Sequence, residues 1–98
     1  MQGMTDIPTD IESRIAADFH AKDRESALFV IRTLGAELDR EGPRILRCVV
    51  SLSCGELSLL AHNADQARSD YRDVIYWAEY DEQDRQVRDF NQPFDPHA

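Results

Sequence analysis

Residues 43–53 read PRILRCVVSLS, and they decide the fold because they are apolar around more than half of a helical circumference. On a helix, only Arg44, Arg47 and Ser51 mark an outer face. A helix with so wide an apolar surface is buried among its neighbours. We therefore expect a central helix, touched by other helices on two sides, with the inward residues Ile45, Leu46, Cys48, Val49, Val50 and Leu52.

The segments on both sides of this helix also repeat their apolar residues at helical spacing, and no run alternates convincingly with the period of two that strands require. Two S/T-x-x-E patterns, Thr9 with Glu12 and Ser53 with Glu56, are typical of reciprocal caps at helix N-termini. The sequence thus predicts an all-α fold, a compact bundle of four to five short helices. The expected helices begin after Pro8, near Asp23, at Pro43, after Gly55, and at Ser69 or Asp70.

Length and charge narrow the class of protein. The 98 residues predict one helical domain, 1–98, with an ordered core at about 9–80 and a polar tail at about 86–98. That tail is either partly flexible or folded back onto the body through Phe90 or Phe94. The formal net charge of −8 argues against binding to nucleic acid or to anionic membranes, since both attract Lys and Arg.

Three features of the sequence predict where the protein is located. No run approaches the roughly 18 apolar residues that span a membrane. The first residues, MQGMTDIPTDIE, lack the basic start and apolar core of a signal peptide. Cys48 and Cys54 lie in the most apolar part of the chain and are expected to be free thiols. We therefore expect a cytoplasmic protein.

Residues 71–85, YRDVIYWAEYDEQDR, carry four aromatic side chains in their first ten positions. On a helix that advances about 100° per residue, the buried stripe consists of Tyr71, Val74, Ile75 and Ala78. Tyr76 and Tyr80 fall on the opposite face, one turn apart, with Trp77 to one side. Past Tyr80 the stripe would continue through charged residues, so the buried part of this helix is expected to end there.

Two interpretations of the second face remain open. In one, Tyr76 and Tyr80 cover the N-terminal helix or the returning tail and keep their hydroxyl groups in water. In the other, the face is an interface for a second copy or a partner protein, because Tyr and Trp are common interface anchors. Phe29 supports the second interpretation, since it lies opposite the apolar stripe of its own predicted helix.

Glu79 borders the buried stripe and faces Ile75 on the same wheel. A carboxylate in that position needs a cationic partner, and three arginines are candidates: Arg44, Arg47 and Arg68. The alternative is a polar pocket near Glu79 that binds a small ligand.

Motifs for catalysis or for cofactors are nearly absent. His20, His62 and His97 are scattered without metal-binding spacing, and no glycine-rich phosphate loop is present. Cys54, beside Gly55 at a helix end, is the thiol with plausible access, but nothing in the pattern requires it to pair with a histidine. We expect no catalytic residues, no metal and no cofactor.

The segment from Arg44 to Tyr80 contains LSCGEL at 52–57 and DYRDVIYWAEY at 70–80. It resembles small uncharacterised bacterial proteins in which one helix ends in a Gly-acid-Leu step and a later helix opens with Asp-Tyr/Trp-Arg-Asp-Val and closes with Ala-Glu-Tyr. The resemblance covers a little over a third of the chain and implies an all-helical fold and a bacterial origin. It implies no activity. Glu56 stands where that pattern has Asp after the glycine.

The sequence therefore predicts a non-enzymatic protein–protein interaction module that self-associates, as a homodimer or larger homo-oligomer, or that binds a partner protein. The expected interface residues are Tyr76, Trp77, Tyr80 and Phe29. The alternative function is a small-ligand-binding or enzyme-accessory helical domain with a polar pocket near Glu79.

Overall fold

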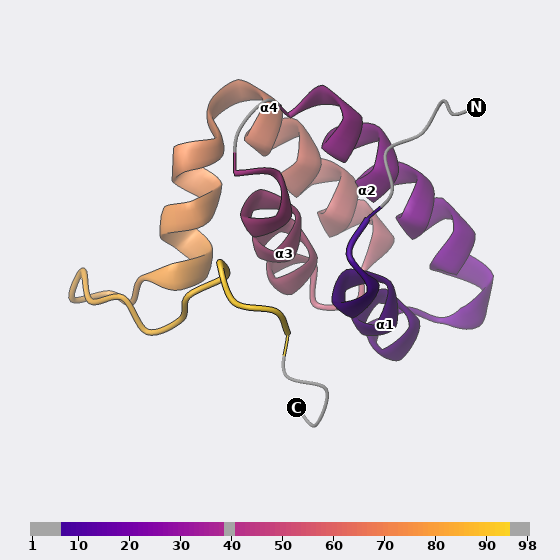
Figure 1. The fold of residues 1–98 in the computed structure, drawn as a ribbon, viewed down its shortest axis with the longest axis horizontal. Coiled ribbons are helices and arrows are strands. Elements are labelled where there is room, and N and C mark those ends of the chain that lie inside the picture. Colours follow the sequence, from indigo (N-terminus) through magenta and orange to yellow (C-terminus); the bar gives the residue numbers. More distant parts are fainter. Residues whose placement is uncertain (1–6, 39–40, 95–98) are drawn as a thin grey trace.

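The computed structural model describes residues 7–38 and 41–94. The chain forms α1 (Thr9–Asp18), a 3-10 turn η1 (Ala21–Asp23), α2 (Arg24–Glu37), α3 (Gly42–Ser53) and α4 (Leu57–Glu79) (Figure 1). The described residues contain no strand beyond an isolated antiparallel bridge between Tyr80 and Gln86. The predicted all-α fold of four to five helices is confirmed.

Helix α3 occupies the centre of the arrangement, as its apolar circumference predicts (Figure 1). It packs most extensively against α4 and also contacts α1 and α2. Every residue from 45 to 50 is buried. The core around it consists largely of aliphatic side chains, among them Ile11, Ile15, Ile31, Leu34, Ile45, Val49, Leu60 and Val74.

Helix α4 changes direction at Asp70, whose backbone is extended (φ −158°, ψ 98°) within an otherwise helical run. The side chain of Asp70 accepts a hydrogen bond from the backbone N–H of Arg72 at 3.0 Å, which is how an N-cap satisfies the first turn. The predicted fourth and fifth helices are therefore the two arms of α4, and Asp70 caps the second arm. This bend places residues 71–79 along the side of α3 (Figure 1).

The predicted capping boxes are wrong. Helix α1 already includes Thr9, with Pro8 in the cap position and no side-chain cap bond. Ser53 ends α3 and donates its hydroxyl back to the carbonyl of Val49, so it is not free to cap α4. In both cases the Ser or Thr belongs to a helix, so its side chain cannot act as the N-cap of the helix that the pattern predicted.

Residues 81–94, which we call the strap, contain no helix and return across the body of the protein (yellow in Figure 1). Phe90 and Phe94 are buried and their rings meet edge to face, with centroids 5.8 Å apart. The tail was predicted either to be partly flexible or to fold back onto the body through Phe90 or Phe94. As far as Phe94, where the described residues end, it folds back onto the body. The core also extends beyond 9–80 at its other end, where Ile7 is buried.

No helix within the described residues is both long enough and apolar enough to cross a membrane.

Gly55 makes a close approach that fixes how α1 meets the α3–α4 turn. Its φ is +76°, and a Cβ at this position would lie 2.3 Å from the carbonyl oxygen of Asp18. We predict that Gly55→Ala lowers the free energy of unfolding by about 2 kcal/mol or more, since it adds a backbone clash to the cost of a left-handed residue with a side chain. Urea denaturation followed by circular dichroism measures the change.

Gly42→Ala is the matched control, because a Cβ there meets no atom within 4 Å apart from its chain neighbours, and Gly42 is the first residue of α3. This variant should change the free energy of unfolding by less than about 1 kcal/mol, because the gain from replacing a helical glycine is opposed by the crowding of a Cβ against the ring of Pro43. Equal losses for the two substitutions would contradict the close approach at Gly55.

Candidate functional site

The aromatic face predicted on the last helix is present and largely exposed. Tyr76 and Trp77 retain 44% and 50% of their accessible surface. Tyr80 is half-buried, and its ring stacks on that of Tyr76 with centroids 5.3 Å apart and planes 20° from parallel. We call Tyr76, Trp77 and Tyr80 the aromatic face.

The strap touches this face at one edge and leaves the rest open. The hydroxyl of Tyr76 donates a hydrogen bond to the carboxylate of Asp84, in the first turn of the strap. Tyr80 forms the isolated bridge with Gln86. The tail therefore covers only the edge of the aromatic face, since Trp77 stays half exposed.

Phe29 is not part of the same surface. It is 63% exposed, on α2. Figure 1 shows α2 and the second arm of α4 on opposite sides of α3, separated along the longest axis of the molecule. The sequence places Phe29 on an outward face correctly, but periodicity within one helix says nothing about which other helix shares that side.

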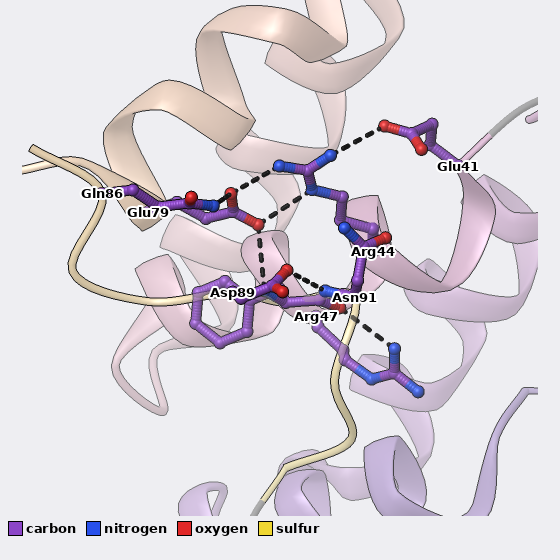
Figure 2. Close-up of polar contacts among 8 residues, drawn as sticks. Glu41, Arg44, Arg47, Glu79, Gln86, Asp89 and Asn91 are labelled. Atoms are coloured by element: carbon purple, nitrogen blue, oxygen red, sulfur yellow. Dashed lines mark hydrogen bonds and ion pairs between the residues drawn. The ribbon is translucent and has the colours of Figure 1, made fainter.

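Glu79 is fully buried and pairs with Arg44, as the wheel and the arginine candidates allow. The guanidinium donates from Nε to Oε2 at 2.9 Å and from Nη2 to Oε1 at 2.6 Å, a bidentate pair (Figure 2). Gln86 donates its amide to Oε1 at 2.9 Å, and the backbone N–H of Phe90 donates to Oε2 at 3.0 Å. Each carboxylate oxygen thus accepts two hydrogen bonds.

These contacts set the charge state of the pair. Burial raises the pKa of Glu79, but the hydrogen bonds from Arg44, Phe90 and Gln86 outweigh it and hold the pKa below the usual 4.5. The hydrogen bond to Glu79 in turn raises the pKa of Arg44. Both groups are therefore charged at neutral pH, and the carboxylate binds the strap in its ionised form.

A second ion pair, which the sequence did not predict, lies beside the first. Arg47 donates to both carboxylate oxygens of Asp10, at 2.9 and 3.2 Å. It also donates to the backbone carbonyl of Phe90 at 3.0 Å (Figure 2). The expectation that Arg47 marks an outer face is wrong, because its residue exposure is only 7%. The strap covers it.

Asp10 also binds the strap directly, through the backbone N–H of Phe94 at 3.0 Å. Burial raises the pKa of Asp10, and the hydrogen bonds from Arg47 and Phe94 more than compensate, so the pKa lies below the usual 3.8. Nearby, the Arg14 guanidinium lies over the Phe94 ring, 4.6 Å from its centroid. The strap-binding site consists of Asp10 and Arg14 on α1, Arg47 on α3 and Glu79 on α4.

One feature of the sequence points to this site: the spacing of two arginines on α3. Arg47 interrupts an otherwise apolar helix three residues after Arg44, so the two side chains share one side of α3. That spacing is compatible with a solvated face and with a covered one. The covering segment is 43 residues away in the chain, which no local pattern reveals.

The two thiols differ in their exposure. Burial raises the pKa of the Cys48 thiol to about 12, which keeps it protonated at neutral pH. Cys54 is exposed, and its thiol donates to the backbone carbonyl of Ser51 at 3.9 Å. Across residues 7–38 and 41–94, no group of three His, Cys, Asp or Glu side chains could hold a metal ion.

The polar pocket expected near Glu79 in the alternative function is filled by the chain itself. All four donors on Glu79 come from Arg44, Gln86 and the backbone of Phe90. A small ligand could reach the carboxylate only after the strap had left.

Comparisons with known proteins give no relative: no family model, curated protein or solved structure matches the chain.

The two carboxylates of the strap-binding site predict how stability depends on pH. Because the pKa values of Glu79 and Asp10 in the folded protein lie below the usual 4.5 and 3.8, their stabilisation is complete above those values. It is lost as the pH falls through the lowered folded values. The free energy of unfolding, measured in urea at a series of pH values, should therefore decrease from about pH 4.5 downward.

Glu79→Gln should lower the free energy of unfolding at pH 7 by about 3 kcal/mol, because it removes one partner of a buried pair, and the loss below pH 4.5 should become shallower. Glu12→Gln is the control, since Glu12 forms a longer, exposed pair with Arg32 at 3.4 Å. That variant should change stability by less than about 1 kcal/mol. Equal effects of the two substitutions would contradict the role given to Glu79.

Proposed function

We propose that the protein is a non-enzymatic, cytoplasmic protein–protein interaction module that self-associates through the aromatic face. The observation that carries the proposal is the exposure of Tyr76 and Trp77 beside a fully satisfied core. Of the five large hydrophobic residues that are exposed in the described chain, Tyr76, Trp77 and Val87 belong to the end of α4 and the start of the strap. Two neighbouring exposed aromatic rings at the end of one helix are more typical of an interface than scattered single residues are.

The chemistry of the face supports an interface with a protein surface. Tyr and Trp bury a large area on association at a small cost in side-chain entropy, and their polar atoms retain hydrogen bonds at a wet rim. Tyr76 is already positioned by its stack on Tyr80 and by its hydrogen bond to Asp84. A pre-positioned ring loses less freedom on binding, which favours association.

Charge sets the conditions under which two copies can associate. The chain carries a net charge of −8, so two copies repel each other at long range. This repulsion is screened over about 8 Å at physiological ionic strength. Self-association through an apolar face should therefore strengthen as salt is added, whereas binding to a basic partner would weaken.

The test is the solution mass from light scattering after size exclusion, over a concentration series. The wild type should approach twice the monomer mass of 11.2 kDa as its concentration rises. Replacing both Tyr76 and Trp77 by Ala should keep the protein monomeric across the same series, because it removes the exposed rings without opening the core.

Phe29→Ala is the matched control: it also removes an exposed aromatic ring, but on the other side of α3. It should leave the mass curve unchanged. If Phe29→Ala abolishes association and the double variant does not, the interface lies on α2. A wild type that stays at 11.2 kDa throughout would contradict self-association altogether.

A further inference from the structure

We propose that the self-associated form is a dimer in which the two copies exchange straps, so that residues 81–94 of each chain occupy the strap-binding site of the other. This inference rests on the proposed self-association and names its mechanism. It is drawn from the kind of contacts that hold the strap, from the turn that begins it, and from the position of the aromatic face beside that turn.

The strap-binding site contacts the strap in the way that a protein contacts a separate extended peptide. The carboxylate of Glu79 accepts a hydrogen bond from the backbone N–H of Phe90, and that of Asp10 accepts one from the backbone N–H of Phe94. Arg47 donates to the backbone carbonyl of Phe90. Both phenyl rings are buried, and Arg14 lies over the second. Main-chain hydrogen bonds combined with side-chain anchors are how proteins commonly bind peptides from other chains.

None of these contacts requires that the strap belong to the same chain as the site. The same atoms can meet in a second copy at the same distances, so the contact free energies cancel between the closed monomer and the exchanged dimer. What decides the balance is the turn that returns the strap, any new contact between the copies, and the entropy of association. A tethered strap meets its own site at an effective concentration of roughly millimolar or more, so exchange requires a turn that resists closure or a new interface.

The turn consists of residues 81–85, between the paired Tyr80 and Gln86. Its backbone is closed by hydrogen bonds from the N–H of Asp81 to the carbonyl of Arg85 and from the N–H of Asp84 to the carbonyl of Asp81. Asp84 has φ +62°, a left-handed conformation that costs free energy for any residue with a side chain, although Asp tolerates it better than most. Residues 82–85 are exposed, so opening the turn uncovers little of the core.

The aromatic face supplies the new interface. Tyr76 contacts Asp84 within the turn, and Tyr80 pairs with the residue that ends it. In an exchanged dimer the two straps cross where the turns had been, next to both aromatic faces. The exposed rings of Tyr76 and Trp77 from the two copies would then be brought together and buried, which no closed monomer achieves.

The first experiment changes the length of the turn. A chain that lacks residues 82–85 keeps only Asp81 between the paired Tyr80 and Gln86, which is shorter than the two-residue minimum of a hairpin loop. It cannot return its strap to its own site, so it should be dimeric at concentrations at which the wild type is monomeric. A matched chain with two glycines inserted between Glu82 and Gln83 should shift the monomer–dimer midpoint to higher concentration. Light scattering measures both. A shortened chain that is folded by circular dichroism yet monomeric overturns the proposal.

The second experiment leaves the turn intact and keeps the test valid if the shortened chain fails to fold. An unlabelled chain with Cys54→Ser and Gln92→Cys carries a spin label on the strap, and it is mixed with ¹⁵N-labelled wild type at a concentration that gives dimer. Cys48 is buried and stays unmodified. Strap exchange predicts paramagnetic broadening of the ¹⁵N-labelled chain's amide signals at Asp10 and Arg14.

The outcomes separate the two proposals. Broadening confined to residues 76–80 of the labelled chain would mean that the faces meet without exchange, which overturns this inference and leaves the proposed self-association standing. A wild type that is monomeric at every concentration overturns both. Broadening on α1 together with a dimeric shortened chain supports exchange.

Discussion

The path of the strap depends on one constraint, the buried carboxylate of Glu79. An ionised group with no exposed surface is costly unless charged and polar donors surround it. One cation, Arg44, satisfies half of the acceptor positions, and the remaining two are taken by Gln86 and the backbone of Phe90. Because the last two donors belong to the strap, α4 cannot bury Glu79 in this way without also fixing where the strap runs.

Helix α3 carries the two arginines that pair with Glu79 and Asp10, three residues apart on one side of an otherwise apolar helix. Arg44 pairs with Glu79 on α4 (Figure 2), and Arg47 pairs with Asp10 on α1. The strap therefore lies over three helices, and its two buried rings, Phe90 and Phe94, lie four residues apart. Two backbone anchors at a fixed spacing, each paired with a buried ring, give the strap a single register. Buried ion pairs of this kind fix the register of the strap more than they add stability, since an apolar pair of the same size would often stabilise the fold as much.

The sequence was sufficient for features that repeat within one helix. The central position of α3 and the end of the buried stripe near Tyr80 were predicted from helical spacing. Asp70 was one of two candidates for the start of the last helix, and Arg44 was one of three candidate partners of Glu79. Arg47 was misplaced because an arginine on an apolar helix faces water unless a distant segment covers it, and the covering residues carry no local signal. Thr9 and Ser53 failed as caps because the motif does not fix where a helix begins. Phe29 was placed on an outer face correctly, but which helix shares that side is a property of packing.

The central claim is that the strap is bound through the backbone amides of Phe90 and Phe94. Amide hydrogen exchange tests it directly, with Asn91 as an internal reference, because the Asn91 N–H donates to the exposed side chain of Asp89. The account predicts that the amides of Phe90 and Phe94 exchange far more slowly than that of Asn91, and that Glu79→Gln lowers the protection at Phe90. Exchange of all three amides at the rate of an unstructured chain would contradict it.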